Sequence, residues 1–335
     1  MIKRLLFLAI VSLFGLNVQA QLFPPLGGQR AGISALTFLK MDLSPRSAGL
    51  GGANLTLSGD GYSVWTNPAA LAETKGLTIG VANTFWAAGT NAGAFSIGKP
   101  TKAGHLALSM SGLSSGAMEV RTEFQPNGTG ELFYASYFSA GLTYSKQLTD
   151  YFRYGISLKY VREQVGNFAA NTAALDLGFL YRTEFNDLSF AVQVQNFGLN
   201  SVLRGDLPDN DPFFSQSRTL EDYPAPTVFQ LAVSMIPWKS ADEKQTLTTL
   251  LQLNHPNDNA ENLRFGLEYA WRELLFLRAG YKLNVVDQNL PTAGFGLRSR
   301  IGRHPLRLDY AFDPSSFQGV FHRIGLAFSV NSEKR

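Results

Sequence analysis

The chain has 335 residues, with 29 Lys and Arg against 26 Asp and Glu, so its net charge is small. Charged residues make up 16% of the chain, well below the roughly 25% of soluble domains, whereas aromatic residues reach 12%. The near balance of charge gives no basis for nucleic-acid binding. The absence of cysteine excludes disulfides, thiolate chemistry and lipid attachment at a mature N-terminal Cys.

Residues 1–20 have the pattern of a secretory signal peptide. Lys3 and Arg4 precede an apolar run from Leu5 to Leu16, and a small-residue cleavage site ends at Ala20. The apolar run is short for a membrane-spanning helix, so we expect export followed by cleavage.

Residues 21–76 are small and Gly-rich, and they lack the alternation that follows them. Asn67 and Pro68 have the order of a helix N-cap and a first helical residue, which predicts a short helix beginning there and continuing through Ala69 to Ala72. Gly49, Gly51 and Gly52 precede strand-like residues rather than a helix, so they do not form a dinucleotide-binding motif. We interpret these glycines as allowing close packing of the backbone.

From residue 77 onward, large apolar residues alternate with small or polar ones. Phe152–Tyr160 (FRYGISLKY) and Leu263–Trp271 (LRFGLEYAW) are clear examples, and period two indicates strands with two unlike faces. The apolar faces end in Tyr or Trp, which favour membrane interfaces. About fourteen strands are predicted, at 77–85, 91–98, 104–112, 136–147, 152–163, 170–183, 187–196, 226–237, 246–254, 262–271, 274–283, 292–300, 305–312 and 321–330.

These strands predict an all-β fold, a transmembrane antiparallel β-barrel over residues 77–331. The alternative is a soluble antiparallel sandwich, but strands of about nine to eleven residues suit a membrane, and the polar faces carry more charge than a compact core would. Short turns, as at Thr149–Asp150, Phe185–Asn186 and Arg272–Glu273, alternate with the long connections 113–135 and 197–225. Because short turns are periplasmic in such barrels, we expect both termini in the periplasm of a bacterial outer membrane.

A barrel of this size is too wide for its own side chains to fill. We therefore expect residues 21–76 to plug the lumen. Within the long connection 113–135, the weak alternation from Met118 to Phe124 predicts an outer-loop hairpin.

Inward charges are predicted on many strands. We expect them either to pair with one another and with the plug, since buried charges need partners, or to line a path for an anionic or amphipathic solute. The remaining inward residues read as mostly Gly and Ala. The predicted lumen-lining charges are Arg153, Lys159, Asp176, Arg264, Glu268, Arg278, Lys282, Arg298, Arg307, Asp309 and Arg323.

The outer loops are where binding to partners is expected. Phe213, Phe214 and Tyr223 lie among acidic residues and prolines in the 197–225 connection and form a candidate docking patch, or else a lid folded over the barrel mouth. The stretch from Asp206 to Asp211 could offer oxygen ligands to calcium. It lacks the Gly and the distal Glu of an EF-hand, so a solvated acidic loop is expected there, and no metal or other cofactor.

Catalytic motifs are weak. The four histidines, His105, His255, His304 and His322, are scattered, and none stands at a spacing with Ser or Asp that suggests a triad. We therefore expect a protein that is not an enzyme.

Three N-terminal segments carry a resemblance to a known family. They are Thr37–Lys40 (TFLK), Pro45–Ala53 (PRSAGLGGA), which includes Arg46, and Trp65–Ala72 (WTNPAALA), and further matches are Glu123–Gly130 (EFQPNGTG), Leu142–Thr149 (LTYSKQLT), Ser157–Tyr160 (SLKY) and Val194–Gly198 (VQNFG). Together they resemble the PorV/PorQ family, outer-membrane relatives of the FadL long-chain fatty-acid transporter.

The resemblance implies a FadL-like barrel of the Bacteroidetes type IX protein secretion system. Its partners would be outer-membrane lipid, a larger translocon barrel and the C-terminal signal domains of secreted cargo. Two functions follow as hypotheses, a protein-binding secretion component and a FadL-like channel for hydrophobic solutes. The channel would need an apolar pocket inside the barrel, so an inward face of Gly, Ala and charge favours the secretion component.

Overall fold

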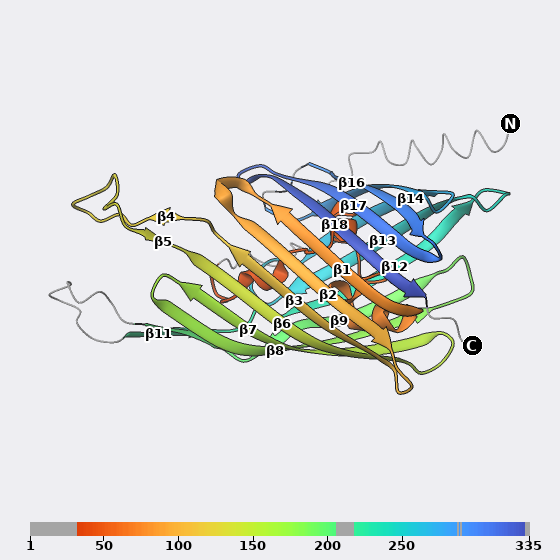
Figure 1. Ribbon diagram of the computed structural model, residues 1–335, viewed down its shortest axis with the longest axis horizontal. Coiled ribbons are helices and arrows are strands. Elements are labelled where there is room, and N and C mark those ends of the chain that lie inside the picture. Colours follow the sequence, from red (N-terminus) through yellow and green to blue (C-terminus); the bar gives the residue numbers. More distant parts are fainter. Residues whose placement is uncertain (1–31, 206–217, 287, 289, 332–335) are drawn as a thin grey trace, which may run out of the picture.

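The computed structural model describes residues 32–205, 218–286, 288 and 290–331, and the signal peptide predicted for residues 1–20 lies outside them. Within this part of the chain, fourteen long antiparallel strands close into a barrel (Figure 1). They are β1 Gly76–Phe85, β2 Asn91–Pro100, β3 His105–Ser114, β6 Ala135–Gln147, β7 Phe152–Val165, β8 Phe168–Arg182, β9 Ser189–Gly198, β12 Val228–Lys239, β13 Gln245–Pro256, β14 Asn262–Trp271, β15 Leu275–Leu283, β16 Thr292–Ile301, β17 His304–Ser315 and β18 Gly319–Asn331.

Each strand pairs with its neighbours in sequence, and β1 pairs with β18 to close the cylinder. Gly76 lies opposite Asn331, so the first and last barrel strands meet at one end, where the short turns also lie. The predicted fourteen-stranded barrel is confirmed. At the turn between β14 and β15, Arg272 and Glu273 both have φ 52°, the conformation required by the two-residue hairpin turn that the sequence predicts.

The opposite end of the barrel carries two extra hairpins that project beyond the wall (Figure 1). One pairs β4 Met118–Glu119 with β5 Leu132–Phe133, and the other pairs β10 Ser201–Gly205 with β11 Arg218–Tyr223. The outer-loop hairpin predicted from Met118–Phe124 is therefore confirmed, and its second arm is β5, near the start of β6.

The two faces of the strands differ as the alternation predicts. On β14 the outward side chains include Phe265 and Leu267, which are 41% and 48% exposed, whereas inward Glu268 is 5% exposed. An apolar outer face with a polar inner face is the arrangement of barrels that contact lipid. Among the described residues, no helix has the length and apolar character needed to cross a membrane.

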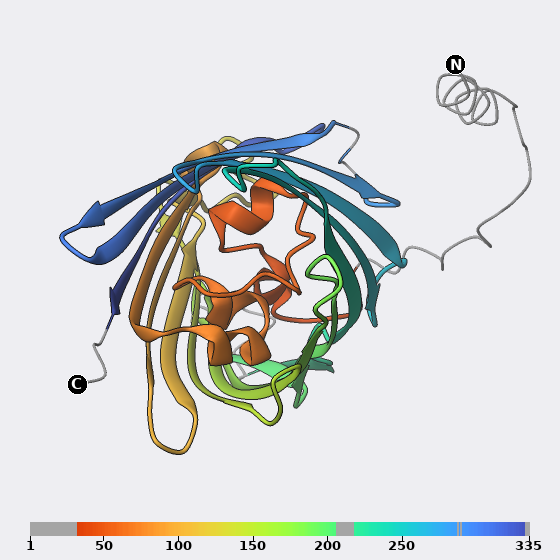
Figure 2. The same cartoon turned by 90° about the vertical axis from the view of Figure 1, so that its right-hand side faces the viewer.

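The segment from residue 32 to β1 lies inside the barrel, as the end-on view in Figure 2 shows. We call it the plug. It is built from short helices and turns, namely η1 Thr37–Lys40, α2 Pro45–Gly49, α3 Ser63–Thr66 and η2 Pro68–Glu73, while the further short helix η3 Ala87–Gly89 lies between β1 and β2.

The buried apolar clusters all combine plug and wall residues. Leu55 and Ala69 of the plug pack with Leu180 and Ala191 of the wall, and Leu50 packs with Leu250. The core of this protein is therefore the junction between plug and barrel.

Candidate functional site

Glycines let the plug backbone approach the barrel wall. Gly51 and Gly52 have φ of +66° and +77°, a region that favours glycine. A Cβ placed on Gly280 of β15 would collide with the backbone of Leu50 and Gly51, and one placed on Gly155 of β7 would collide with Pro68 and Ala69. The close packing predicted for the plug glycines is thus matched by glycines in the wall.

Asn67 stabilises the part of the plug that packs against Gly155. Its side-chain oxygen accepts a hydrogen bond from the Ala69 amide at 2.9 Å, capping η2 with Pro68 at the first helical position. Its side-chain nitrogen donates to the Leu55 carbonyl at 2.9 Å. Since Asn67 is fully buried, these bonds hold two plug turns together beside the wall.

A buried network of three arginines and three carboxylates joins the plug to β14, β15 and β17. Arg46 binds Glu268 at 2.8 Å and Asp60 at 2.9 Å. Glu268 also binds Arg278 at 2.6 Å, and Arg278 binds Asp309 at 2.8 Å. The sixth member, Arg307, lies 2.9 Å from Asp309. The formal charges of the network cancel, and the side chains are almost wholly shielded from water.

The other predicted lumen charges also have partners. Lys159 binds Asp176 at 2.7 Å, and Arg153 binds Glu73 of the plug at 3.1 Å. Arg298, near the turn end, binds Glu273 at 3.1 Å.

At the loop end, Arg323 binds Asp313 at 2.9 Å and donates to the Asp42 carbonyl at 3.0 Å. Lys282 also binds Asp313, at 3.3 Å. Arg264 donates to Asn262 at 3.1 Å and to the Gly52 carbonyl. Burial raises the pKa of the Asp42 carboxyl, against the opposing effect of nearby Arg323.

The sequence analysis left out several of these carboxylates. Asp60 and Glu73 lie in the plug, where no periodicity marks a residue as inward, and Asp313 lies one residue beyond the predicted end of its strand. With these three acids and Arg46 included, the excess of lumen cations falls from five (eight against three) to three (nine against six). The contacts match the pairing interpretation rather than an open cationic path.

Two hollows of different size occupy the loop end and interior of the barrel. A vestibule of about 720 Å³ opens at the end with the long connections, with Phe38, Met41 and Arg323 among its lining residues. Deeper in the lumen is a hollow of about 60 Å³ between the plug and β3, β6, β7 and β8. We call it the serine chamber.

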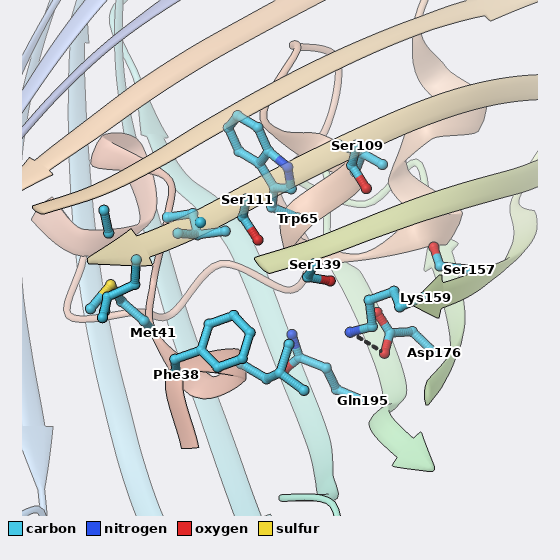
Figure 3. A pocket seen from close by; sticks show the side chains of 16 residues that line it. Phe38, Met41, Trp65, Ser109, Ser111, Ser139, Ser157, Lys159, Asp176 and Gln195 are labelled. Carbon is cyan, nitrogen blue, oxygen red and sulfur yellow. Dashed lines mark ion pairs between the residues drawn. The ribbon is translucent and has the colours of Figure 1, made fainter. Parts of the chain in front are cut away.

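The serine chamber has one apolar and one polar side. Figure 3 shows Phe38, Met41 and Trp65 of the plug facing Ser109, Ser111, Ser139 and Ser157 of the wall. Lys159 and Asp176 lie at its edge as an ion pair (Figure 3). Phe38 and Met41 also line the vestibule, so the two hollows adjoin.

The prediction that the inward face is mostly Gly, Ala and charge is therefore incomplete. It omitted the serines just described and the inward amides of β9, β12 and β13, such as Gln193, Gln230 and Gln252. Most of the apolar lining of the serine chamber comes from the plug, whose sequence has no alternation to reveal it. A short apolar run in residues 36–43 was the one available signal.

The loop residues proposed for docking are only partly described. Tyr223 ends β11 and is 39% exposed, whereas Phe213, Phe214 and the acidic stretch 206–211 lie outside the described residues. In the described part of the chain, no group of three or more His, Cys, Asp or Glu residues could hold a metal ion.

Comparisons with known proteins find similarity in structure alone. No protein-family model matches the sequence, and no curated protein matches it. The toluene transporter TodX of Pseudomonas putida is 12% identical with a TM-score of 0.56, over 86% of this chain and 98% of that one. The toluene transporter TbuX of Ralstonia pickettii is 11% identical with a TM-score of 0.55, over 85% and 96%.

A FadL homologue from Pseudomonas aeruginosa is 10% identical with a TM-score of 0.51, over 85% of this chain and 97% of that chain. At such identities the likeness establishes the fold. The chain folds as a plugged fourteen-stranded barrel, and this fold matches that of the FadL/TodX-type barrels. These similar structures are transporter and channel barrels.

Proposed function

We propose that the protein spans the bacterial outer membrane and admits a small solute with an apolar body, entering by the vestibule and resting in the serine chamber. The observation that carries this proposal is the chamber itself, in which apolar plug residues face a hydroxyl-lined wall. Ligand sites typically combine apolar surface with a few placed polar groups. The similar structures include two toluene transporters, which supports a channel for hydrophobic solutes over a secretion component.

The ion pair at the edge of the serine chamber limits the charge of the solutes that can bind there. Lys159 is neutralised by Asp176 at 2.7 Å, and it also donates to Asn196 at 2.5 Å. A strongly anionic solute would have to displace these contacts. The chamber therefore suits an apolar solute, or one with a single polar group that can bond to the serines.

The proposed orientation places the long connections outside the cell and both termini in the periplasm. The apolar outer face, the signal peptide expected at residues 1–20 and the short turns at the terminal end support it. In this orientation the vestibule faces the environment, from which a solute would be taken up.

Uptake of labelled toluene, a small neutral apolar solute, by Gram-negative cells that lack their own channel for it tests the proposal. Ser139→Phe would fill the chamber, because Ser139 is inward and 5% exposed. Ser136→Phe is the matched control, because it makes the same change at an exposed position on the outward face of β6. We expect Ser139→Phe to reduce uptake to that of cells without the barrel and Ser136→Phe to leave it unchanged. Equal uptake by the two variants would contradict a route through the chamber.

A second candidate function is the protein-binding role implied by the PorV/PorQ resemblance. The hairpin β4–β5 projects beyond the barrel mouth (Figure 1), and Phe124 in its loop is 95% exposed. Leu132 and Tyr134 nearby are 58% and 53% exposed. An exposed apolar tip on a rigid barrel favours contact with another protein, such as a larger translocon barrel or secreted cargo.

Pull-down from mildly solubilised outer membranes tests this second function. Replacing residues 120–131 with a Gly-Ser linker should abolish recovery of a larger barrel or secreted protein, while the barrel still folds. Recovery that does not change with this replacement would argue against a docking role for the hairpin.

A further inference from the structure

A second inner hollow differs in chemistry from the serine chamber. It has a volume of about 190 Å³ and lies between the plug and the strands β9, β12, β13 and β14. We call it the amide chamber, because six of its lining residues have side-chain amides. These are Asn54, Gln195, Gln230, Asn254, Asn259 and Asn262.

The charged groups around the amide chamber are already occupied. Lys40 binds Asp258 at 2.6 Å. Arg264 donates to Asn262 at 3.1 Å and to the Gly52 carbonyl, and its Nη2 lies 2.9 Å from the terminal amide of Asn254. The Asp42 carboxylate accepts from the Ser44 amide at 3.2 Å and from the Ser47 hydroxyl. An anionic ligand would find no cation without a partner among these lining residues.

Several neutral polar groups of the chamber have no partner among the described residues. The side-chain nitrogens of Gln195 and Asn262 make no hydrogen bond there, and neither does the side-chain oxygen of Gln230. The indole nitrogen of Trp65 is buried without a partner. The chamber thus presents both donors and acceptors, beside the apolar surface of Met41 and Leu43.

We infer that the amide chamber binds the polar part of a neutral, polyhydroxylated ligand such as a sugar ring. A hydroxyl both donates and accepts, so it complements amide groups of both kinds. A hydrocarbon would leave the amides unpaired, which costs about 1–3 kcal/mol for each buried group. The volume equals that of about six waters in the liquid, which suits one small ring.

This inference goes beyond the proposed channel, because binding in the amide chamber requires no passage through the barrel. Gln195, Met41 and Trp65 line both inner chambers, so a ligand with a hydroxylated ring and a small apolar group can contact both. Figure 3 shows these three side chains on the lining of the serine chamber.

Binding to the complete mature protein in phosphatidylcholine nanodiscs tests the inference, because this lipid carries no sugar. The probes are four neutral compounds (the methyl glycosides of glucose, galactose and mannose, and inositol), with cyclohexanol and cyclohexanecarboxylate as ring-matched apolar and anionic comparisons. Saturation-transfer NMR measures each affinity. We expect at least one neutral polyhydroxylated probe to bind saturably and more tightly than both comparison rings.

Variants then locate the site. Gln230→Leu and Asn262→Leu should each weaken binding about fivefold to tenfold, the effect of one lost hydrogen bond. Gln193→Leu is the matched control, an inward amide on β9 that is 1% exposed and lies outside the chamber lining. Heat-modifiable electrophoretic mobility checks that each variant folds.

The inference is overturned if none of the four polyhydroxylated probes binds wild-type protein saturably, or if either comparison ring binds more tightly. It is also overturned if Gln193→Leu weakens binding as much as the two chamber variants. Toluene uptake is measured separately, so a failure of the channel proposal would not change the interpretation of the binding result.

Discussion

Glu268 is the residue whose loss should most weaken the attachment of the plug. Its carboxylate lies 2.8 Å from Arg46, 2.6 Å from Arg278 and 3.5 Å from Arg307, and its side chain is 6% exposed. Glu268→Gln keeps the shape but leaves one uncompensated positive charge in a site shielded from water. Removal of one partner from a buried ion pair typically costs about 3–5 kcal/mol, and we expect a loss of unfolding free energy in this range.

The surface pair Lys239–Asp187 provides the matched control. Its two side chains are 45% and 46% exposed. The distance between them is 3.0 Å, close to the 2.8 Å between Arg46 and Glu268. Exposed pairs contribute about 0–1 kcal/mol, so Asp187→Asn should change stability by less than about 1 kcal/mol. Urea unfolding in detergent micelles, followed by tryptophan fluorescence, measures both variants.

A double variant separates the effect of an unbalanced charge in the network from the loss of the contact between Arg46 and Glu268. Arg46→Gln with Glu268→Gln removes one cation and one anion, so the remaining four members of the network are again neutral. We expect the double variant to lose at least about 1 kcal/mol less than the sum of the two single variants, the size of coupling typical of residues in one network. Strict additivity, or a Glu268→Gln variant as stable as Asp187→Asn, would refute the reasoning.

Three further predictions concern the fit between plug and wall. Asn67→Ala should lower the unfolding free energy by about 1–3 kcal/mol in the same urea assay, because it removes a cap and leaves the buried Leu55 carbonyl without that donor. Gly280→Ala should sharply reduce the heat-modifiable folded fraction because its Cβ would collide with Leu50 and Gly51, whereas Gly93→Ala, with its nearest neighbour at 3.7 Å, should fold normally. The pair Leu50→Cys with Gly266→Cys should form a disulfide, seen as a mobility shift reversed by reductant, since a Cβ on Gly266 would lie 3.1 Å from that of Leu50, close to the usual range of about 3.5–4.5 Å. Oxidation should leave toluene uptake unchanged, and a loss of uptake on oxidation would show that the plug must move there.

The wall of the barrel could be predicted from the sequence because its two faces meet different solvents. For β14 the predicted and observed bounds coincide at residues 262 and 271, since every second residue from Leu263 is large and apolar. The prediction for β17 stopped at residue 312, whereas pairing with β18 continues through Pro314 to Ser315. Beyond the apolar band both faces contact polar surroundings, so alternation ends while the hydrogen-bond ladder goes on.

The outer-loop hairpin was predicted, but the register that pairs β4 with β5 could not be read from the sequence. Met118 and Glu119 pair with Phe133 and Leu132 in a ladder of two residues on each side. So short a ladder has no buried face, and its register leaves no periodic mark in the sequence. The segment from Met118 to Phe124 suggested a hairpin only because its residues alternate by composition.

The site was harder to predict than the fold because its two sides come from segments with different patterns. The wall supplies hydroxyls, amides and charges, which strand periodicity can place on the inward face. The plug supplies Phe38, Met41 and Trp65, whose direction depends on contacts such as that of Arg46 with Glu268. No local rule connects residue 46 with residue 268, so the apolar lining of the lumen is visible only in the folded protein.

Residues that hold the plug in place differ from residues that would determine the selectivity of the barrel. The wall glycines and the charge network hold the plug in one position, and changes to them should act first on folding. Three serines of the serine chamber, by contrast, make few contacts that the fold requires. Within the described part of the chain, the side chains of Ser109, Ser111 and Ser139 make no hydrogen bond. Replacing any of them with Ala should leave the unfolding free energy nearly unchanged while altering which solutes bind. If all three Ser→Ala variants lost stability as Glu268→Gln does, the serines would be part of the attachment of the plug and the chamber would have no independent role in binding.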